Sequence, residues 1–145
     1  MPRSKVSEKN KYYISKERYY ELFHFCKQFT DWKKAVNEIN PYPKRYLSMS
    51  SKTKSDDSIV ETTAIDMADY EYKIHLVCEA RHKAIMDFDW GSDYEALVCS
   101  DALQVNVTEN IPYDILATRY YLLPSRDEFY KIRRAFFWYL SQLRN

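Results

Sequence analysis

The sequence predicts an all-α fold, in which long N-terminal helices pack as a hairpin or a dimer seam and a helix-turn-helix follows at the C-terminus. The 145 residues include one glycine and five prolines, too few turn-forming residues for a sheet protein of this length. Apolar residues recur at helical spacing, and no segment shows the alternation of a strand. Because chains of this length usually form one domain, we expect a single helical domain over 1–145.

The chain opens with residues 1–13, a charged segment expected to be a flexible basic arm. Ser15 is a suitable N-cap for a helix that runs to about residue 40 and ends at Pro41 and Pro43. Residues 41–57 are rich in Ser, Lys and Pro and are expected to be a mobile connection. The apolar positions of the helix follow one face: Tyr19, Leu22, Cys26, Phe29, Val36 and Ile39.

A second long helix is expected from a capping box at Ser58 and Glu61 to about residue 86. Its heptad-spaced positions would pair with the first helix, or with the same helix of a second copy. Ser92 and Glu95 form another capping box, which opens a short helix over about 93–104 and completes a long-helix scaffold over 14–104. The heptad positions are Val60, Ala64, Met67, Glu71, Ile74, Cys78, Arg81 and Ile85.

Residues 108–145 are expected to form the helix-turn-helix part. A short helix over about 111–119 carries Pro112 in its first turn, the turn reads YYLLP, and Ser125 with Glu128 caps a final helix to about residue 143. One face of the final helix is apolar and carries Phe129, Ile132, Phe136, Leu140 and Leu143. The other face is polar and carries Arg126, Asp127, Tyr130, Lys131 and Arg134, with Arg133 at its margin.

The polar face has the chemistry of a DNA recognition helix, although a solvated charged face is the alternative. Arg126 and Asp127 lie in the first turn, where a recognition helix meets base edges, and arginine can bond guanine with two hydrogen bonds. Lys131, Arg133 and Arg134 would hold phosphates.

The net charge of +1 divides into basic ends and an acidic middle. Residues 1–54 carry +8, residues 55–118 carry −11 and residues 119–145 carry +4. Basic ends suit contact with nucleic acid, and packing of basic helices on acidic ones is the alternative interpretation.

Residues 124–140, PSRDEFYKIRRAFFWYL, resemble the C-terminal motif of RinA-like and ArpU-like late-gene activators from phages and prophages of Gram-positive bacteria. The C-terminal part of that family is similar to the DNA-binding region of sigma factors. The resemblance rests mainly on the pairs Phe129-Tyr130 and Arg133-Arg134. It implies groove or phosphate contacts by Arg126, Asp127, Lys131, Arg133 and Arg134.

No other motif predicts chemistry. His24, Cys26, His75 and Cys78 can be imagined as zinc ligands, but the thiols fall on predicted core stripes. The four acids from Asp87 to Glu95 could bind a metal, but no His or Lys lies at a spacing typical of a catalytic site. They are better explained as residues at helix ends. We therefore expect no enzyme, no cofactor and no metal site. Three cysteines without a CxxC pair favour a reducing, cytoplasmic location, which the resemblance implies is that of a bacterial host. No apolar run is long enough for a membrane span.

The polar face and charge pattern predict a DNA-binding regulator of transcription that acts as a homodimer on double-stranded DNA. The resemblance implies that it is of the phage type, with RNA polymerase as the candidate protein partner. The alternative is a non-enzymatic protein-interaction module, whose acidic helical surface binds a host factor such as RNA polymerase or mimics DNA as an inhibitor.

Overall fold

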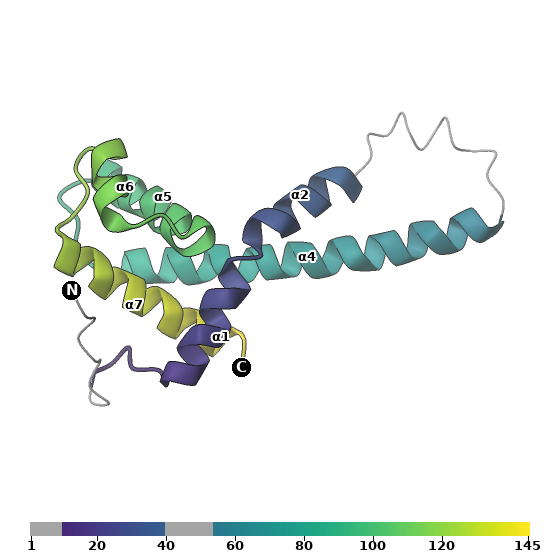
Figure 1. The fold of residues 1–145 in the computed structure, drawn as a ribbon, viewed down its shortest axis with the longest axis horizontal. Coiled ribbons are helices and arrows are strands. Elements are labelled where there is room, and N and C mark those ends of the chain that lie inside the picture. Colours follow the sequence, from purple (N-terminus) through teal and green to yellow (C-terminus); the bar gives the residue numbers. More distant parts are fainter. Residues whose placement is uncertain (1–9, 40–53) are drawn as a thin grey trace. The chain divides into compact units, whose positions relative to one another are not determined.

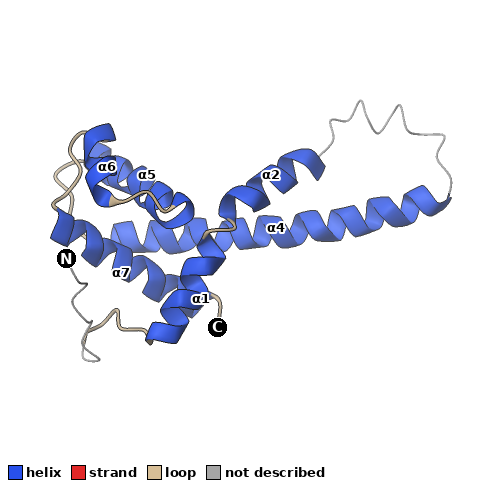
Figure 2. Ribbon diagram, viewed as in Figure 1, coloured by secondary structure: helices blue, strands red, loops and turns tan. Residues whose placement is uncertain are grey.

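The computed structural model describes the backbone of residues 10–39 and 54–145, and the side chains of residues 10–38 and 64–145. Within these ranges the chain consists of helices and turns and contains no strand, which confirms the predicted all-α class (Figure 2). The helices are α1 (Lys16–Cys26), α2 (Phe29–Ile39), α4 (Lys54–Met86), α5 (Asp93–Glu109), α6 (Tyr113–Arg119) and α7 (Arg126–Leu143), as Figure 1 shows. None of these helices is long and apolar enough to span a bilayer.

Three of the helices begin at the serine caps that the sequence predicted. The hydroxyl of each serine accepts a hydrogen bond from the backbone N–H three residues later, at 3.2 Å for Ser15, 3.2 Å for Ser92 and 3.3 Å for Ser125. Such a cap satisfies one of the free N–H groups at a helix start and stabilises it by about 1 kcal/mol.

The first predicted helix is in fact two helices, α1 and α2, because the helix is interrupted at Lys27 and Gln28. The Lys27 N–H bonds the Phe23 carbonyl at 3.2 Å, and the Gln28 N–H bonds the Phe25 carbonyl at 3.2 Å. The Gln28 side chain donates to the His24 carbonyl at 3.4 Å. The last carbonyls of α1 are therefore satisfied without the Gly or Pro that usually marks a helix end.

Two other helix boundaries differ from the prediction. Helix α4 begins at Lys54, so Ser58 lies inside the helix and does not open it. Helix α5 continues to Glu109 and ends at Asn110, which takes a left-handed φ of 58°. Asparagine tolerates this conformation better than most residues and commonly follows a helix end. Most of the predicted connection 41–57 lies outside the described residues.

The described residues form two compact units. The first contains the residues up to Gln28 together with Leu76–Asn145, and the second contains Phe29–His75. In the first unit α7 packs against α1 and α5, and α6 packs against α5 (Figure 1). The predicted apolar face of α7 is confirmed as core at four positions, and Phe137, which we did not expect there, joins it. The fully buried side chains of this unit include Phe129, Ile132, Phe136, Phe137 and Leu140 from α7.

The second unit has a smaller apolar centre around Phe29 and Trp32 on α2, which are 2% and 4% exposed. The Lys73 ammonium of α4 lies 5.8 Å from the centroid of the Trp32 ring, so the two helices are neighbours within this unit. The predicted seam on α4 is incomplete here, because Ala64 and Glu71 are exposed. The side chain of Val60 lies outside the described residues.

Residues 10–13 were expected to belong to a flexible arm, but they pack on the first unit. Tyr12 donates a hydrogen bond of 2.9 Å from its hydroxyl to Asp87, just beyond the end of α4, and its ring lies edge-on to Trp138 with centroids 5.9 Å apart. Tyr139 also donates a hydrogen bond to the Asp87 carboxylate, and the Lys11 ammonium lies 3.6 Å from Oδ2 of Asp87. We call Tyr12, Asp87, Trp138 and Tyr139 the Tyr12 clamp. The rest of the predicted arm, residues 1–9, lies outside the described residues.

The clamp lowers the pKa of its carboxyl group, Asp87, and raises the pKa of its two phenols, Tyr12 and Tyr139. The hydrogen bond from Tyr139, followed by that from Tyr12, lowers the pKa of Asp87 against the opposing effect of burial. The pKa of Tyr12 rises to about 12, first through burial and then through its bond to Asp87, and that of Tyr139 rises to about 12 chiefly through its own bond to Asp87. The clamp therefore needs an ionised carboxylate and neutral phenols.

We predict that Asp87→Asn lowers stability at neutral pH and weakens its acid dependence. Because the folded pKa of Asp87 is depressed, its contribution is present above the unfolded pKa of about 3.9 and is lost as pH falls through the folded value. Urea unfolding at a series of pH values measures this. Below the folded pKa the two proteins should converge, and parallel pH curves for both would contradict the assignment.

Candidate nucleic-acid interface

The candidate interface is built from α6, the turn 120–125 and α7. The Tyr113 hydroxyl at the start of α6 donates to the Pro124 carbonyl at 2.6 Å, and the Tyr113 ring lies 5.5 Å from that of Phe129. These contacts tie the two ends of the turn together. Helix α6 packs against α5, and the order of helices alone fits a helix-turn-helix, so that motif stays a prediction.

The predicted site residues are distributed unequally between solvent and core. Arg126, Asp127 and Lys131 are exposed, and Tyr130 and Arg134 are half-buried. Arg133 is 6% exposed and lies in the core. Five of the six side chains therefore reach the surface.

Arg133, which the sequence predicted to hold a phosphate, is engaged within the core instead of facing solvent. Its Nε donates a hydrogen bond of 2.7 Å to Oδ1 of Asn106 on α5, and its guanidinium lies 4.9 Å from the centroid of the Phe137 ring. The rings of Tyr19 and Tyr130 lie 5.6 Å and 5.9 Å away. A buried charge is tolerated when it is hydrogen-bonded and when aromatic faces surround it.

Asn106 extends this contact to the connection between α5 and α6. Its amide Nδ2 donates to the carbonyl of Ile111 at 2.9 Å, while its Oδ1 accepts from Arg133. We call Arg133, Asn106 and the Ile111 carbonyl the Arg133–Asn106 network. The network therefore joins α7, α5 and the chain leading into α6, and it adds directional contacts to the apolar packing that turns one side of α7 to solvent.

The buried Cys26 lies in the field of this arginine. Burial raises the pKa of the Cys26 thiol to about 12, although Arg133 and then Arg144 oppose the shift. Burial likewise raises the pKa of the Cys99 thiol to about 12. Both thiols are therefore protonated packing groups rather than nucleophiles.

Arg126 is held on the surface at the N-terminal end of α7. Its Nη1 lies 3.3 Å from Oδ1 of Asp114 on α6, and both side chains are more than half exposed. Its guanidinium also lies 5.7 Å from the centroid of the Tyr130 ring. Exposed ion pairs of this kind are weak, so Arg126 can exchange Asp114 for another acceptor.

Trp138 joins the exposed side of α7, which the sequence interpretation missed. Lys131, Arg134 and Trp138 are spaced by three and four residues, so at 100° per residue they lie within one narrow arc of the helix. Trp138 is half-buried and its ring lies edge-on to Tyr12 and Tyr139 of the clamp. The helical spacing from Lys131 was a signal that could have identified it. We call Lys131, Arg134 and Trp138 the α7 arc.

The described side chains offer no metal centre: none of them forms a group of three or more His, Cys, Asp or Glu residues that could hold an ion. The acids around residue 91 act locally instead. Glu95 accepts a hydrogen bond of 3.2 Å from the backbone N–H of Gly91 and donates its own N–H to Ser92. The sequence interpretation of this segment as helix-end residues therefore fits its contacts.

Comparison of the chain with protein-family models, with curated proteins and with solved structures finds no match.

We predict that Arg133 and Asn106 are energetically coupled. Arg133→Met leaves Oδ1 of Asn106 without its donor, and Asn106→Leu leaves the guanidinium without its acceptor, so each change should cost about 2 kcal/mol of unfolding free energy. The double variant removes both partners and should cost less than the sum by about 1 kcal/mol. Denaturant unfolding of the four proteins measures the cycle, and additive losses would show that the two side chains act independently.

Proposed function

We propose that this protein is a phage-type regulator of transcription that binds double-stranded DNA through the α7 arc and the N-terminal end of α7. The observation that supports this most is the α7 arc itself: two cations and an indole in line on the open side of a helix whose other side is core. A helix fixed in this way can enter or line a groove without losing order.

The chemistry of the exposed residues suits the two parts of DNA recognition. Lys131 and Arg134 can neutralise phosphates, which supplies affinity without sequence information. Arg126 and Asp127 lie in the first turn of α7, where Arg126 can bond the two acceptors of guanine and Asp127 can accept from cytosine. Arg133 does not contact DNA in this proposal, because its guanidinium is buried and hydrogen-bonded to Asn106.

The segment that carries the arc has the sign of charge that DNA requires. Residues 119–145 carry a net charge of +4, although the chain as a whole carries only +1. Binding should therefore depend steeply on salt. The resemblance of residues 124–140 to phage late-gene activators adds support that is independent of the arc.

The proposal includes a homodimer and RNA polymerase as the protein partner, in the cytoplasm of a bacterial host. On α4, Ile65 and Tyr72 are 64% and 57% exposed and lie seven residues apart, on one face. Large apolar side chains at this spacing suit a helix-helix contact with a second copy.

We predict that Lys131→Gln and Arg134→Gln each weaken binding to all duplex sequences alike. Each should also lower the slope of log affinity against log salt by about 1, because one phosphate contact is lost. Fluorescence anisotropy with labelled duplexes at several salt concentrations measures both. Lys83→Gln is the matched control, since it removes one exposed charge from α4. Equal losses for Lys83→Gln, or no binding by the natural protein at micromolar concentration and low salt, would reject the proposal.

We predict that Asp114→Asn tightens DNA binding several-fold. The change releases Arg126 from its 3.3 Å ion pair and removes a negative charge beside the groove-facing turn. Arg126→Gln should instead relax the preference at one base pair by about 1–3 kcal/mol. Competition among single-base variants of a selected site measures both effects. If Asp114→Asn weakens binding as much as Arg126→Gln does, the ion pair orients Arg126 and does not compete with DNA.

A further inference from the structure

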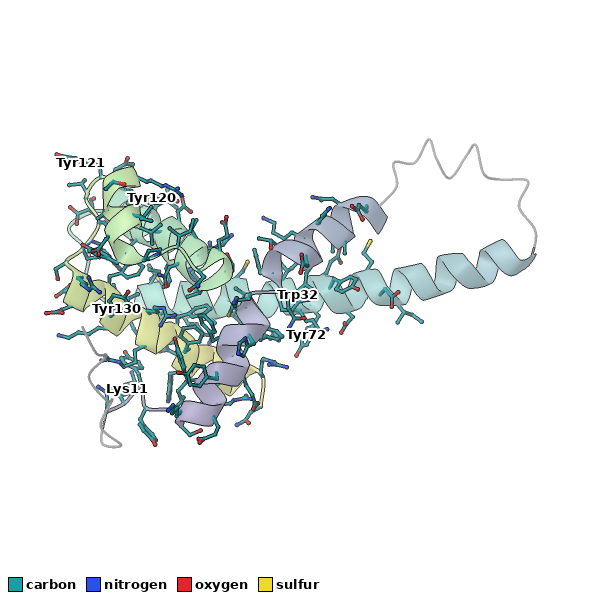
Figure 3. The ribbon with its side chains drawn as sticks, viewed as in Figure 1. Lys11, Trp32, Tyr72, Tyr120, Tyr121 and Tyr130 are labelled. Atoms are coloured by element: carbon teal, nitrogen blue, oxygen red, sulfur yellow. The ribbon has the colours of Figure 1, made fainter. Side chains whose placement is uncertain are left out.

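The turn between α6 and α7 exposes apolar side chains that a connecting turn would normally avoid. Tyr121 is 80% exposed and projects from the end of α6 (Figure 3), and Leu122 is 45% exposed. Ile115, on α6, is also 45% exposed. Single exposed apolar residues are ordinary, but Tyr121 and Leu122 are consecutive and together form an apolar patch in the turn.

A hollow of about 300 Å³ lies at this patch. It is open to solvent, and polar atoms form more of its exposed lining than apolar atoms do. Its volume is at the lower end of the range for ligand pockets, enough for one large side chain. The Tyr113 hydroxyl is engaged by the Pro124 carbonyl at 2.6 Å, so the ring of Tyr113 is held in place in the lining. The other residues that line it include Ala117, Thr118, Arg119, Tyr120 and Leu122.

Leu122 takes a backbone conformation that leucine rarely adopts. Its φ of 68° lies in the left-handed region, which costs a residue with a side chain about 1–2 kcal/mol. The Tyr113 hydrogen bond on one side and the Ser125 cap on the other hold the turn in this state. Strain of this kind persists where the surrounding structure holds it, and it concentrates at binding sites.

The charge at the hollow is positive. Arg119 is exposed and lines the hollow, and it forms no ion pair with any residue whose side chain is described. Asp114, the acid of α6, is paired with Arg126 at 3.3 Å. A ligand seated in the hollow therefore gains most when it places a carboxylate beside Arg119.

We propose that this hollow is the docking site for a protein segment in which an aromatic or large aliphatic side chain stands next to an aspartate or glutamate. The apolar side chain fills the hollow between Tyr113, Tyr120 and Leu122, and the carboxylate pairs with Arg119. This site shares α6 and the turn 120–125 with the candidate nucleic-acid interface but does not include the α7 arc, and its test needs no DNA.

Two other occupants fit less well. A second copy of the chain, related by a two-fold axis, would bring its own Arg119 to the same contact, and like charges across an interface disfavour it. A DNA phosphate would satisfy Arg119 but would leave Tyr121 and Leu122 unburied. An acidic and apolar protein segment satisfies both the charge and the apolar surface.

The experiment is an NMR titration of the full chain with 3-phenylpropionate, an aromatic ring with a carboxylate. We expect shifts of the methyl groups of Ala117, Leu122 and Leu123 and a dissociation constant in the millimolar range, as for other small ligands of this size. 3-Phenylpropan-1-ol should bind several-fold more weakly, and 3-phenylpropylamine more weakly still. Arg119→Gln should abolish the preference for the carboxylate, whereas Lys83→Gln, which also removes one exposed charge, should retain it.

The proposal is overturned if millimolar 3-phenylpropionate leaves the three methyl signals unchanged, or if Arg119→Gln retains the preference. It is also overturned if sedimentation velocity shows a dimer of the natural protein and a monomer of the Tyr121→Ala variant, because a second copy then occupies the hollow. Arg119 and Tyr121 are exposed, so both variants should keep the spectrum of the folded protein elsewhere. The readout involves no DNA, and its result is therefore independent of the proposed regulator function.

Discussion

One buried charge links three parts of the first unit, α7, α5 and the chain leading into α6. Arg133 of α7 lies in the core of this unit. The cost of removing its guanidinium from water is offset by a 2.7 Å hydrogen bond to Asn106 and by the aromatic rings around it. The same amide holds the Ile111 carbonyl. These directional contacts favour the same rotation of α7 about its own axis as its buried apolar face does.

That rotation decides which charges are available for binding. With Arg133 turned inward, Lys131 and Arg134 remain on the open side together with Trp138, and Arg126 stays at the exposed end beside Asp114. Of the four cations on α7 up to residue 134, Arg133 is buried and the other three reach the surface. A rotation of α7 by one residue would exchange these roles, because neighbouring positions are 100° apart.

The sequence predicted what depends on local patterns. The caps at Ser15, Ser92 and Ser125 form with residues three positions away, and the apolar face of α7 follows from helical spacing. The break between α1 and α2 was missed because neither Gly nor Pro occurs there. The core position of Arg133 could not be predicted, since its acceptor Asn106 lies 27 residues away in sequence. A helical wheel placed it only at the margin of the polar face.

The Tyr12 clamp illustrates the same limit. Residues 10–13 look like part of a charged tail in the sequence, but Tyr12 finds its acceptor, Asp87, 75 residues away. The clamp also supplies the ring contact that holds Trp138 at the end of the α7 arc. The N-terminal segment, the end of α4 and α7 thus meet at one carboxylate.

We propose that α7 contacts DNA through its arc while Arg133 stays in the core. An NMR titration of the labelled protein with a short duplex tests it through two signals, the indole N–H of Trp138 and the Nε–H of Arg133. The account predicts that the Trp138 signal shifts, while the Arg133 signal stays in place and remains protected from exchange. A shift of the Arg133 signal with loss of protection would mean that the guanidinium leaves Asn106 for the DNA, and would contradict the account.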